Sequence, residues 1–306
     1  MTGNGLRQGI VITRYNKNLT IEDDDGVLRP ATARKRLEPP VCGDRVLWRS
    51  ADDLQVVIES LGERESLLAR PDKHGKLKPI AANITQMMII NAVDKNRPLD
   101  FNDTLTDHYL VTAETLQIRP VIVLNKIDLV SDIQLDQIQT HFTQYQELDY
   151  PVIYTSVKNG RGQDRLINQL LDQTSIFVGE SGGGKSSLID SLLPEQVLRT
   201  GKLSNVSGKG MHTTTATTLY HLPHGGDLID SPGVREFGLT LNDCQAIAEG
   251  FREFRPYLGQ CKFRDCRHLG EQGCAVAQAC EEMKIQSRRL DSYRKMVSMF
   301  VTSANR

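Results

Sequence analysis

Hydrophobic and polar residues follow three different patterns along the chain, and each pattern predicts a different structure. Before residue 79, short apolar runs alternate with polar positions and are separated by turn residues, as in the strands of a small antiparallel barrel. From there to residue 240, longer apolar runs alternate with helical patterns, which favours a parallel sheet covered on both faces. The last part has two helical stretches around a group of cysteines. We therefore predict three domains, at residues 1–78, 79–240 and 241–306.

The first domain is predicted to be an all-β barrel of the oligonucleotide-binding type, because five short strands fit its length. Such barrels bind single-stranded nucleic acid through basic and aromatic groups on one face. The best candidates for a phosphate contact are Arg34, Lys35 and Arg36, with an exposed basic loop as the alternative interpretation. The polar segment 69–79 indicates a linker. We expect strands at residues 9–13, 19–21, 45–48 and 56–58.

The central domain is predicted to be an α/β unit that binds its ligand at the carboxyl ends of parallel strands. Two motifs directly follow predicted strands: Asn125 comes after a run that ends at Leu124, and Gly179 comes after a run that ends at Val178. We expect strands at residues 87–93, 121–123, 152–154 and 175–178, and helices at about 104–116, 133–142 and 185–193.

The segment after Val178 predicts a phosphate-binding loop at the start of a helix. Its glycines let backbone N–H groups approach phosphate oxygens, and the helix N-terminus adds a favourable dipole. Lys185 is expected to bridge the β- and γ-phosphates of a nucleotide, and the hydroxyl of Ser186 is expected to bind Mg²⁺. The predicted phosphate contacts in this loop are Gly179, Glu180, Ser181, Gly182, Gly183, Gly184, Lys185, Ser186 and Ser187.

The earlier segment Asn125-Lys126-Ile127-Asp128 is predicted to select guanine. A carboxylate at Asp128 can accept hydrogen bonds from both N1–H and the 2-amino group of guanine, whereas adenine has an acceptor at N1. Lys126 is expected to lie along the base, and Asn125 to tie the loops together. Ser156, Val157 and Lys158 follow the next strand and are similar to a Ser-Ala-Lys element, whose backbone N–H contacts the guanine oxygen.

The two motifs stand in an unusual order along the chain. In an ordinary GTPase, the phosphate loop opens the domain and the Asn-Lys-x-Asp segment closes it, whereas here the guanine motif precedes the phosphate loop. We therefore predict a P-loop GTPase domain with circularly permuted topology, in which the same sheet is threaded from a different starting strand.

A third nucleotide motif is predicted at Asp230 and Gly233, which match a D-x-x-G pattern after an apolar run. Asp230 is expected to hold Mg²⁺ through water, and the N–H of Gly233 to sense the γ-phosphate. The polar segment 202–215 lies between the two phosphate motifs. Thr213 or Thr214 is expected to complete the Mg²⁺ shell in the triphosphate state, unless this segment is simply a flexible loop.

The residue after Gly233 is Val234, at a position where many GTPases have a glutamine that orients the attacking water. Valine has no polar group for this role. His212 is the nearest candidate for the catalytic group, with a solvated histidine as the alternative interpretation.

Four potential metal ligands lie within residues 261–274, namely Cys261, Cys266, His268 and Cys274. Thiolates and an imidazole suit the tetrahedral preference of Zn²⁺, and four protein ligands leave no open position, so we predict one structural zinc ion. The alternative is that the cysteines are reduced core residues. Cys280 is a possible substitute ligand, whereas Cys42 and Cys244 are expected to be small buried residues.

The composition is that of an ordinary globular protein that does not cross a membrane. The 306 residues are 39% hydrophobic and 25% charged, and no stretch reaches the roughly 18 uncharged apolar residues that a spanning helix needs. Because the first residues also lack the apolar core of a signal peptide, we expect a cytoplasmic protein. The net charge of −1 hides slightly basic flanks and an acidic middle, either as ordinary scatter or as surfaces that face nucleic acid.

These features together resemble the circularly permuted GTPases of the RsgA (YjeQ) family over essentially the whole chain. The resemblance implies an N-terminal oligonucleotide-binding barrel, a central GTPase that uses GTP and Mg²⁺ and leaves GDP, and a small C-terminal helical zinc domain. It also implies slow hydrolysis that the small ribosomal subunit stimulates during late maturation. It is carried by residues 125–128 ahead of 179–186, by residues 212–215 and 230–239, and by the spacing of the four zinc ligands.

The partner implied by this resemblance is the small ribosomal subunit with its rRNA, bound by a monomer. Lys262, Arg264 and Arg267 lie between the predicted zinc ligands, and we expect them to face ribosomal RNA, with a solvated basic face as the alternative.

Two other functions remain open. The first is a nucleotide-gated RNA-binding module with negligible turnover, which Val234 favours. The second is an ATPase of the transporter type, which the glycine-rich phosphate loop permits, although the chain has no Leu-Ser-Gly-Gly-Gln signature.

Overall fold

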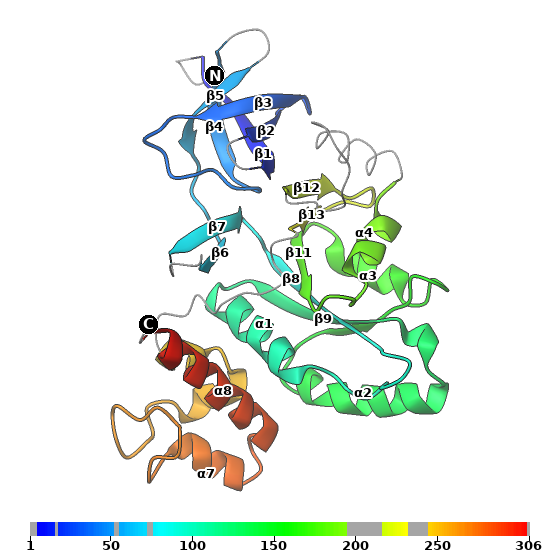
Figure 1. Cartoon of the computed structure of the whole chain (residues 1–306), viewed down its shortest axis with the longest axis vertical. Coiled ribbons are helices and arrows are strands. Elements are labelled where there is room, and N and C mark those ends of the chain that lie inside the picture. The colour runs from blue at the N-terminus through cyan, green and yellow to red at the C-terminus, as the bar shows by residue number, and fades with distance from the viewer. Residues whose placement is uncertain are drawn as a thin grey trace.

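Three groups of elements follow one another along the chain, as Figure 1 shows. The computed structural model describes residues 5–15, 18–51, 55–71, 76–194, 216–231 and 244–304. Four predicted site residues, His212, Thr213, Thr214 and Gly233, therefore lie outside the described residues, as does Val234.

The N-terminal group is a closed five-stranded barrel. Its strands pair in the order β1-β2-β3-β5-β4, and β4 also pairs with β1, so the barrel has no free edge. Alternate residues point inward, and Val11, Ile21, Trp48 and Ile58 form the centre of its core. The strands are β1 (Arg7–Tyr15), β2 (Asn18–Asp23), β3 (Leu28–Ala33), β4 (Arg45–Ser50) and β5 (Val56–Leu61).

A two-stranded antiparallel hairpin connects the barrel to the central domain. It consists of β6 (Leu67–Pro71) and β7 (Leu77–Ala82). The segment 69–79, expected to be a linker, does lie between the barrel and the central domain, but most of its described residues are in the two strands of this hairpin. The physical reason lies at its ends, because Leu68 and Ala81 pair across the hairpin and are fully buried.

The central sheet has the strand order β10-β9-β8-β11-β13-β12. All neighbouring pairs are parallel except β12 with β13, so the carboxyl ends of five strands meet at one edge. The strand before the phosphate loop, β11, is central in space although three strands of the sheet precede it in sequence. The strands are β8 (Gln86–Ala92), β9 (Arg119–Asn125), β10 (Val152–Tyr154), β11 (Thr174–Gly179), β12 (Thr217–His221) and β13 (Asp227–Asp230).

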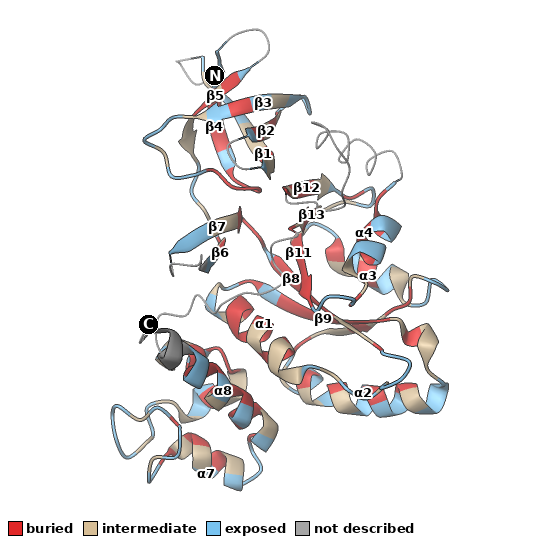
Figure 2. Ribbon diagram, viewed as in Figure 1, coloured by how far each residue is buried: buried red, intermediate tan, exposed pale blue. Residues whose placement is uncertain are grey.

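Helices cover both faces of this sheet, because alternate strand residues are apolar on both sides. Ile89 and Leu124 pack under α1 (Asp103–Thr115) and α2 (Asp132–Gln146). Their neighbours Ile90 and Val123 pack under α3 (Gln163–Leu170) and α4 (Lys185–Leu192). Figure 2 shows the resulting buried positions along the central strands and on the helix sides that face them.

The barrel and the central sheet form one continuous sheet. Strand β12 pairs antiparallel with β1, with Thr13 opposite Thr218 and Arg14 opposite Thr217. A second contact lies beside this pairing, where His221 of β12 bridges Asp227 on β13, at 2.6 Å, and Glu22 on β2, at 3.1 Å.

The C-terminal group packs against α1. Phe251, Phe254 and Tyr293 form an aromatic cluster with ring centroids 4.8 to 5.8 Å apart, and Val111 of α1 belongs to the same core. The elements are α6 (Cys244–Glu249), the 3-10 helix η3 (Arg252–Tyr257), α7 (Ala275–Glu281) and α8 (Ser287–Ala304).

A buried ionic network joins α8 to α1. Both carboxylate oxygens of Asp107, which is fully buried, accept hydrogen bonds: Oδ1 from Arg289 at 2.5 Å and Oδ2 from Arg288 at 2.8 Å. Arg289 also donates to Glu253 at 2.6 Å. Burial alone lowers the pKa of Arg289, but the carboxylates of Asp107 and Glu253 outweigh it and raise that pKa.

Among the described residues, no helix combines the length and the apolar character needed to span a lipid bilayer.

Candidate nucleotide-binding and zinc sites

The predicted phosphate loop leaves β11 and enters α4, as the sequence indicates. Gly184 lies at the turn into the helix with φ +85°. A Cβ atom there would lie 2.4 Å from Nδ2 of Asn125, so glycine is needed both for the backbone conformation and for the approach of a second loop. The Lys185 ammonium donates to the carbonyl oxygens of Gly179, at 2.7 Å, and Glu180, at 2.6 Å. The loop is thus folded around the cation that is predicted to bind phosphate.

The predicted guanine motif contacts the phosphate loop directly. Asn125 ends β9, is 2% exposed and donates from Nδ2 to the carbonyl of Gly183 at 3.2 Å. Lys126 donates from Nζ to the carbonyl of Gly182 at 2.7 Å, across 56 residues of sequence. Two segments that are remote in the chain are therefore in direct contact at the carboxyl edge of the sheet.

Asp128 lies in the short 3-10 helix η1 (Ile127–Leu129) and is held by the loop after β10. The hydroxyl of Ser156, which is fully buried, donates to Oδ1 of Asp128 at 2.5 Å. Lys158 Nζ lies 4.0 Å from Oδ2. Because Ser156 fixes one oxygen, the carboxylate has a defined orientation for pairing with a base.

Asp230 lies at the same edge of the sheet. It ends β13, which runs parallel to β11 with Ile229 opposite Ile176. The next residue, Ser231, has its hydroxyl 3.1 Å from that of Thr217 on β12. A carboxylate at this strand end and the exposed hydroxyl of Ser186 are oxygen ligands of the kind that Mg²⁺ prefers, so the residues present fit this ion.

Sequence reasoning missed a contact between α1 and the phosphate loop. Asn102 caps α1 by accepting from the N–H of Leu105, and its Nδ2 donates to the carboxylate of Glu180 at 2.5 Å. The only sequence signal was an Asn at a helix start, which indicates a cap but not a partner.

The four predicted zinc ligands come together at the start of α7. Their ligand atoms lie within 4.8 Å of one another, and Nδ1 of His268 is 3.5 Å from Cys261 Sγ, 3.6 Å from Cys266 Sγ and 3.3 Å from Cys274 Sγ. Tetrahedral Zn²⁺ with ordinary bond lengths sets N···S at about 3.6 Å. The residues present therefore fit a closed Cys₃His zinc site.

The protonation of the cluster depends on whether a cation is bound. Burial raises the pKa of the Cys266 thiol to about 12 and raises that of Cys274, so these thiols stay protonated without a metal. Burial lowers the pKa of His268, which keeps the imidazole neutral and able to coordinate. A divalent ion reverses the balance at the thiols because it stabilises thiolates.

Backbone groups support the cluster from outside. The N–H of Ala275 donates to Cys261 Sγ at 3.3 Å, and the N–H of Ala277 donates to Cys274 Sγ at 3.4 Å. The carboxylate of Glu271 accepts from the N–H groups of Arg267 and Leu269, at 2.9 and 2.7 Å. Glu271 was not predicted from sequence, because an acidic residue between glycines has no distinctive signal. Cys280 lies on α7 outside the cluster, and Cys42 is fully buried as expected.

The predicted RNA-binding residues differ in their surroundings. Arg34 forms two hydrogen bonds to Glu59, at 3.0 and 2.8 Å, whereas Lys35 and Arg36 are exposed on the same turn. Lys262, Arg264 and Arg267 are all exposed on the zinc loop, which we define as residues 258–274.

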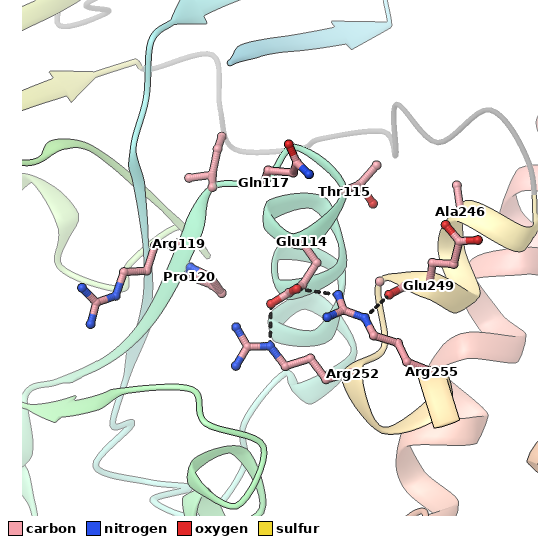
Figure 3. A pocket seen from close by; sticks show the side chains of 11 residues that line it. Glu114, Thr115, Gln117, Arg119, Pro120, Ala246, Glu249, Arg252 and Arg255 are labelled. Carbon is pink, nitrogen blue, oxygen red and sulfur yellow. Dashed lines mark hydrogen bonds and ion pairs between the residues drawn. The ribbon is translucent and has the colours of Figure 1, made fainter. Parts of the chain in front are cut away.

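A cavity of about 770 Å³ lies elsewhere, between the central domain and the C-terminal group (Figure 3). Glu114 of α1 pairs there with Arg252 at 2.7 Å and with Arg255 at 2.6 Å. Arg119 and Pro120 line it at the start of β9, so it lies at the edge of the sheet opposite to Asn125. The ion pairs of Glu114 connect the two domains across this cavity, which is separate from the nucleotide motifs.

Comparisons with known proteins agree with this geometry. The family described as RsgA GTPase matches residues 61–240. A "Small ribosomal subunit biogenesis GTPase RsgA 1" of Vibrio vulnificus (strain YJ016) is 44% identical over 306 residues, which is 98% of this chain and 86% of that protein. The "Small ribosomal subunit biogenesis GTPase RsgA" of Haemophilus influenzae (strain PittGG) is 43% identical over 295 residues, 95% of this chain and 84% of that protein.

Two solved structures have the same architecture. One is YjeQ from Thermotoga maritima, with a TM-score of 0.76, 29% identity and coverage of 97% of this chain and 99% of that chain. The other is YloQ, described as a circularly permuted GTPase, with a TM-score of 0.74, 27% identity and coverage of 99% and 97%.

Proposed function

The chain belongs to the RsgA GTPase family, and from this membership and its paired nucleotide motifs we propose that it hydrolyses GTP in the biogenesis of the small ribosomal subunit. The observation that carries the proposal is the direct bonding of Asn125 and Lys126 to the phosphate loop. One nucleotide can therefore have its base at Asp128 and its phosphates at Lys185. A carboxylate in this position would face the N1 acceptor of adenine and find no N–H donor there, so the site favours GTP over ATP.

We propose that the loop backbone and Lys185 bind the phosphates, while Asp128 with Ser156 selects guanine. Ser186, Asp230 and Thr213 or Thr214 would hold Mg²⁺, which when bound neutralises charge on the phosphate oxygens. Water attacks the γ-phosphorus, the bond to the β,γ-bridging oxygen breaks, and GDP and phosphate are formed. His212 is our candidate for orienting that water, and it lies outside the described residues together with both threonines.

We propose that hydrolysis is slow in the free protein, is stimulated by the small subunit and is coupled to release from it. The exposed cations Lys35, Arg36, Lys262, Arg264 and Arg267 are the candidates for contact with rRNA, and Arg34 would have to exchange its partner Glu59 for phosphate. The protein is expected to act as a cytoplasmic monomer with one structural Zn²⁺ in its Cys₃His cluster.

The decisive measurement is the GTPase rate with no subunits, with purified small subunits and with large subunits. We expect strong stimulation by small subunits alone, and loss of activity in Lys185→Ala. A single-turnover rate that small subunits leave unchanged would favour the nucleotide-gated RNA-binding module instead. Tighter binding of ATP than of GTP in calorimetry would contradict the guanine assignment.

A further inference from the structure

The zinc loop exposes an aromatic side chain among cations. Phe263 is 46% exposed, and Leu269 on the same loop is 45% exposed. Building on the proposed function, we propose that Phe263 is a stacking platform for an unpaired base of ribosomal RNA, with Lys262, Arg264 and Arg267 binding the flanking phosphates.

The cations around Phe263 are available for phosphate. No carboxylate of the described residues lies within ion-pair distance of Lys262, Arg264 or Arg267, in contrast to Arg34, which is bonded to Glu59. The loop has two carboxylates of its own: that of Glu271 accepts hydrogen bonds from backbone N–H groups, and Asp265, the neighbour of Arg264, is exposed and forms no ion pair within the part of the chain that the structure describes. The loop therefore has three exposed cations against two carboxylates, and none of these cations is in an ion pair with a described residue.

The zinc loop holds Phe263 in place before any partner binds. The N–H of Cys266 donates to the carbonyl of Phe263 at 3.3 Å, which closes a tight turn on a zinc ligand. The N–H of Lys262 donates to the carbonyl of Gly273 at 2.9 Å, and a Cβ at Gly273 would lie 2.8 Å from Cβ of Lys262. The backbone is thus anchored at Lys262 and at the carbonyl of Phe263, so little backbone conformational entropy is lost when a base stacks on the ring.

The chemistry of the loop favours an unpaired nucleotide over a protein partner. Exposed aromatic rings bind unstacked bases, and nearby cations bind the flanking phosphates without reading the sequence. Lys262 Nζ lies over one face of the Phe263 ring, 5.4 Å from its centre, in a cation–π contact, so a base would stack on the opposite face, with this cation close to its phosphate. A protein-binding site would instead be expected to concentrate apolar groups and to exclude charge from its centre.

The first experiment measures the affinity of full-length protein for purified small subunits. Phe263→Ala is expected to weaken binding roughly tenfold, while Phe263→Tyr retains it because the ring is kept. Met283→Ala is the matched control, since Met283 is also in the C-terminal group and is 90% exposed. Zinc content is measured for every variant, so that loss of the loop structure is recognised.

The second experiment uses Phe263→Trp as a fluorescent reporter. The chain has one tryptophan, Trp48, which is 2% exposed in the barrel, so the emission of an exposed indole at position 263 can be separated with a solvent quencher. Single-stranded oligoadenylate is expected to quench this emission more than an RNA duplex of the same length, because paired bases are not free to stack.

The proposal is overturned if Phe263→Ala binds small subunits as tightly as the unchanged protein, or if oligoadenylate and duplex quench the reporter equally or not at all. Lost subunit affinity without any response to RNA would assign the surface to a ribosomal protein, which also overturns it. Failure of the unchanged protein to bind small subunits would contradict the proposed function itself, which is a separate result.

Discussion

Asn125 and Gly184 show how single residues join the two halves of the nucleotide site. The amide of Asn125 can approach the loop only because position 184 has no Cβ. Gly182 has almost the same φ, +84° against +85°, but no described atom lies within 4 Å of a Cβ built there. A side chain at position 182 would therefore cause backbone strain alone, whereas one at position 184 would cause the same strain and also a clash with Asn125.

We expect Gly184→Ala to destabilise the nucleotide-free protein more than Gly182→Ala. Both changes impose the strain of a left-handed residue, of about 1–3 kcal/mol, but only the first forces Asn125 away from the loop. Denaturant unfolding of both variants measures the difference. Equal losses of stability would show that the contact between Asn125 and the loop contributes nothing.

At the scale of elements, two parts of the structure depend on the solution conditions: the zinc loop depends on bound zinc, and the contacts of β12 depend on pH. The zinc loop lies between η3 and α7 and depends on four side chains for its shape. The side chain of His221 on β12 bridges two carboxylates, Asp227 on the neighbouring strand β13 and Glu22 on β2, which lies beyond β1.

We expect the purified protein to contain one zinc ion per chain and Cys274→Ser to lose it. Because desolvation raises the pKa of the Cys266 and Cys274 thiols, removal of the ion leaves protonated thiols packed together, and the C-terminal group should unfold at a lower temperature. A colorimetric chelator measures the zinc. Cys280→Ser, on α7 but outside the cluster, is the control and should keep its zinc.

The stability of the β12 junction should depend on pH through His221. The hydrogen bond to Asp227 raises the pKa of His221, against the effect of burial, and the charges of Asp227 and Glu22 add to it. A raised pKa in the folded state stabilises below the unfolded value of about 6.5 and is lost as pH rises through the folded value. His221→Gln should therefore lower the melting temperature more at about pH 6 than at about pH 9.

The control for this prediction is His224→Gln, since His224 is an exposed residue of the turn between β12 and β13. Its effect should be small at both pH values. If His221→Gln lowered the melting temperature equally at both pH values, the protonated form of His221 would not be the form that stabilises the contact with Asp227 and Glu22.

At the scale of the whole molecule, α1 connects the nucleotide site to the C-terminal group. Its cap residue Asn102 contacts Glu180 in the phosphate loop, and one turn further Asp107 binds Arg288 and Arg289 of α8. The phosphate loop and α8 therefore contact the same rigid helix.

Breaking the buried ionic network should loosen this connection. Arg289→Met removes the guanidinium that pairs with Glu253 and one of the two arginine partners of Asp107, so we expect a loss of about 3–5 kcal/mol in the free energy of unfolding. Guanidinium denaturation measures it. Lys295→Met, at an exposed position of the same helix, is the control and should change little. A loss below about 1 kcal/mol for Arg289→Met would contradict this account.

The sequence predicted those parts of the molecule whose signals are local. Strand β10 was expected at its observed bounds, and the helix after the phosphate loop differs by one residue, because apolar runs and glycines mark them. Strand β3 was missed, since it contains Pro30 and alternates with exposed residues. The pairing of β12 with β1 and the bond between Arg289 and Asp107 depend on partners far away in the chain, and no local pattern indicates them.

The pairing of β1 with β12 has a consequence for anyone who wishes to dissect this protein. A fragment that starts after the barrel would leave the N–H and C=O groups of β12 bare along one side of the sheet, and such bare strands recruit further copies. The central domain without the barrel should therefore aggregate through the exposed edge of β12. An exchange of barrels between relatives should succeed only if the residues that pair β1 with β12 are exchanged as well.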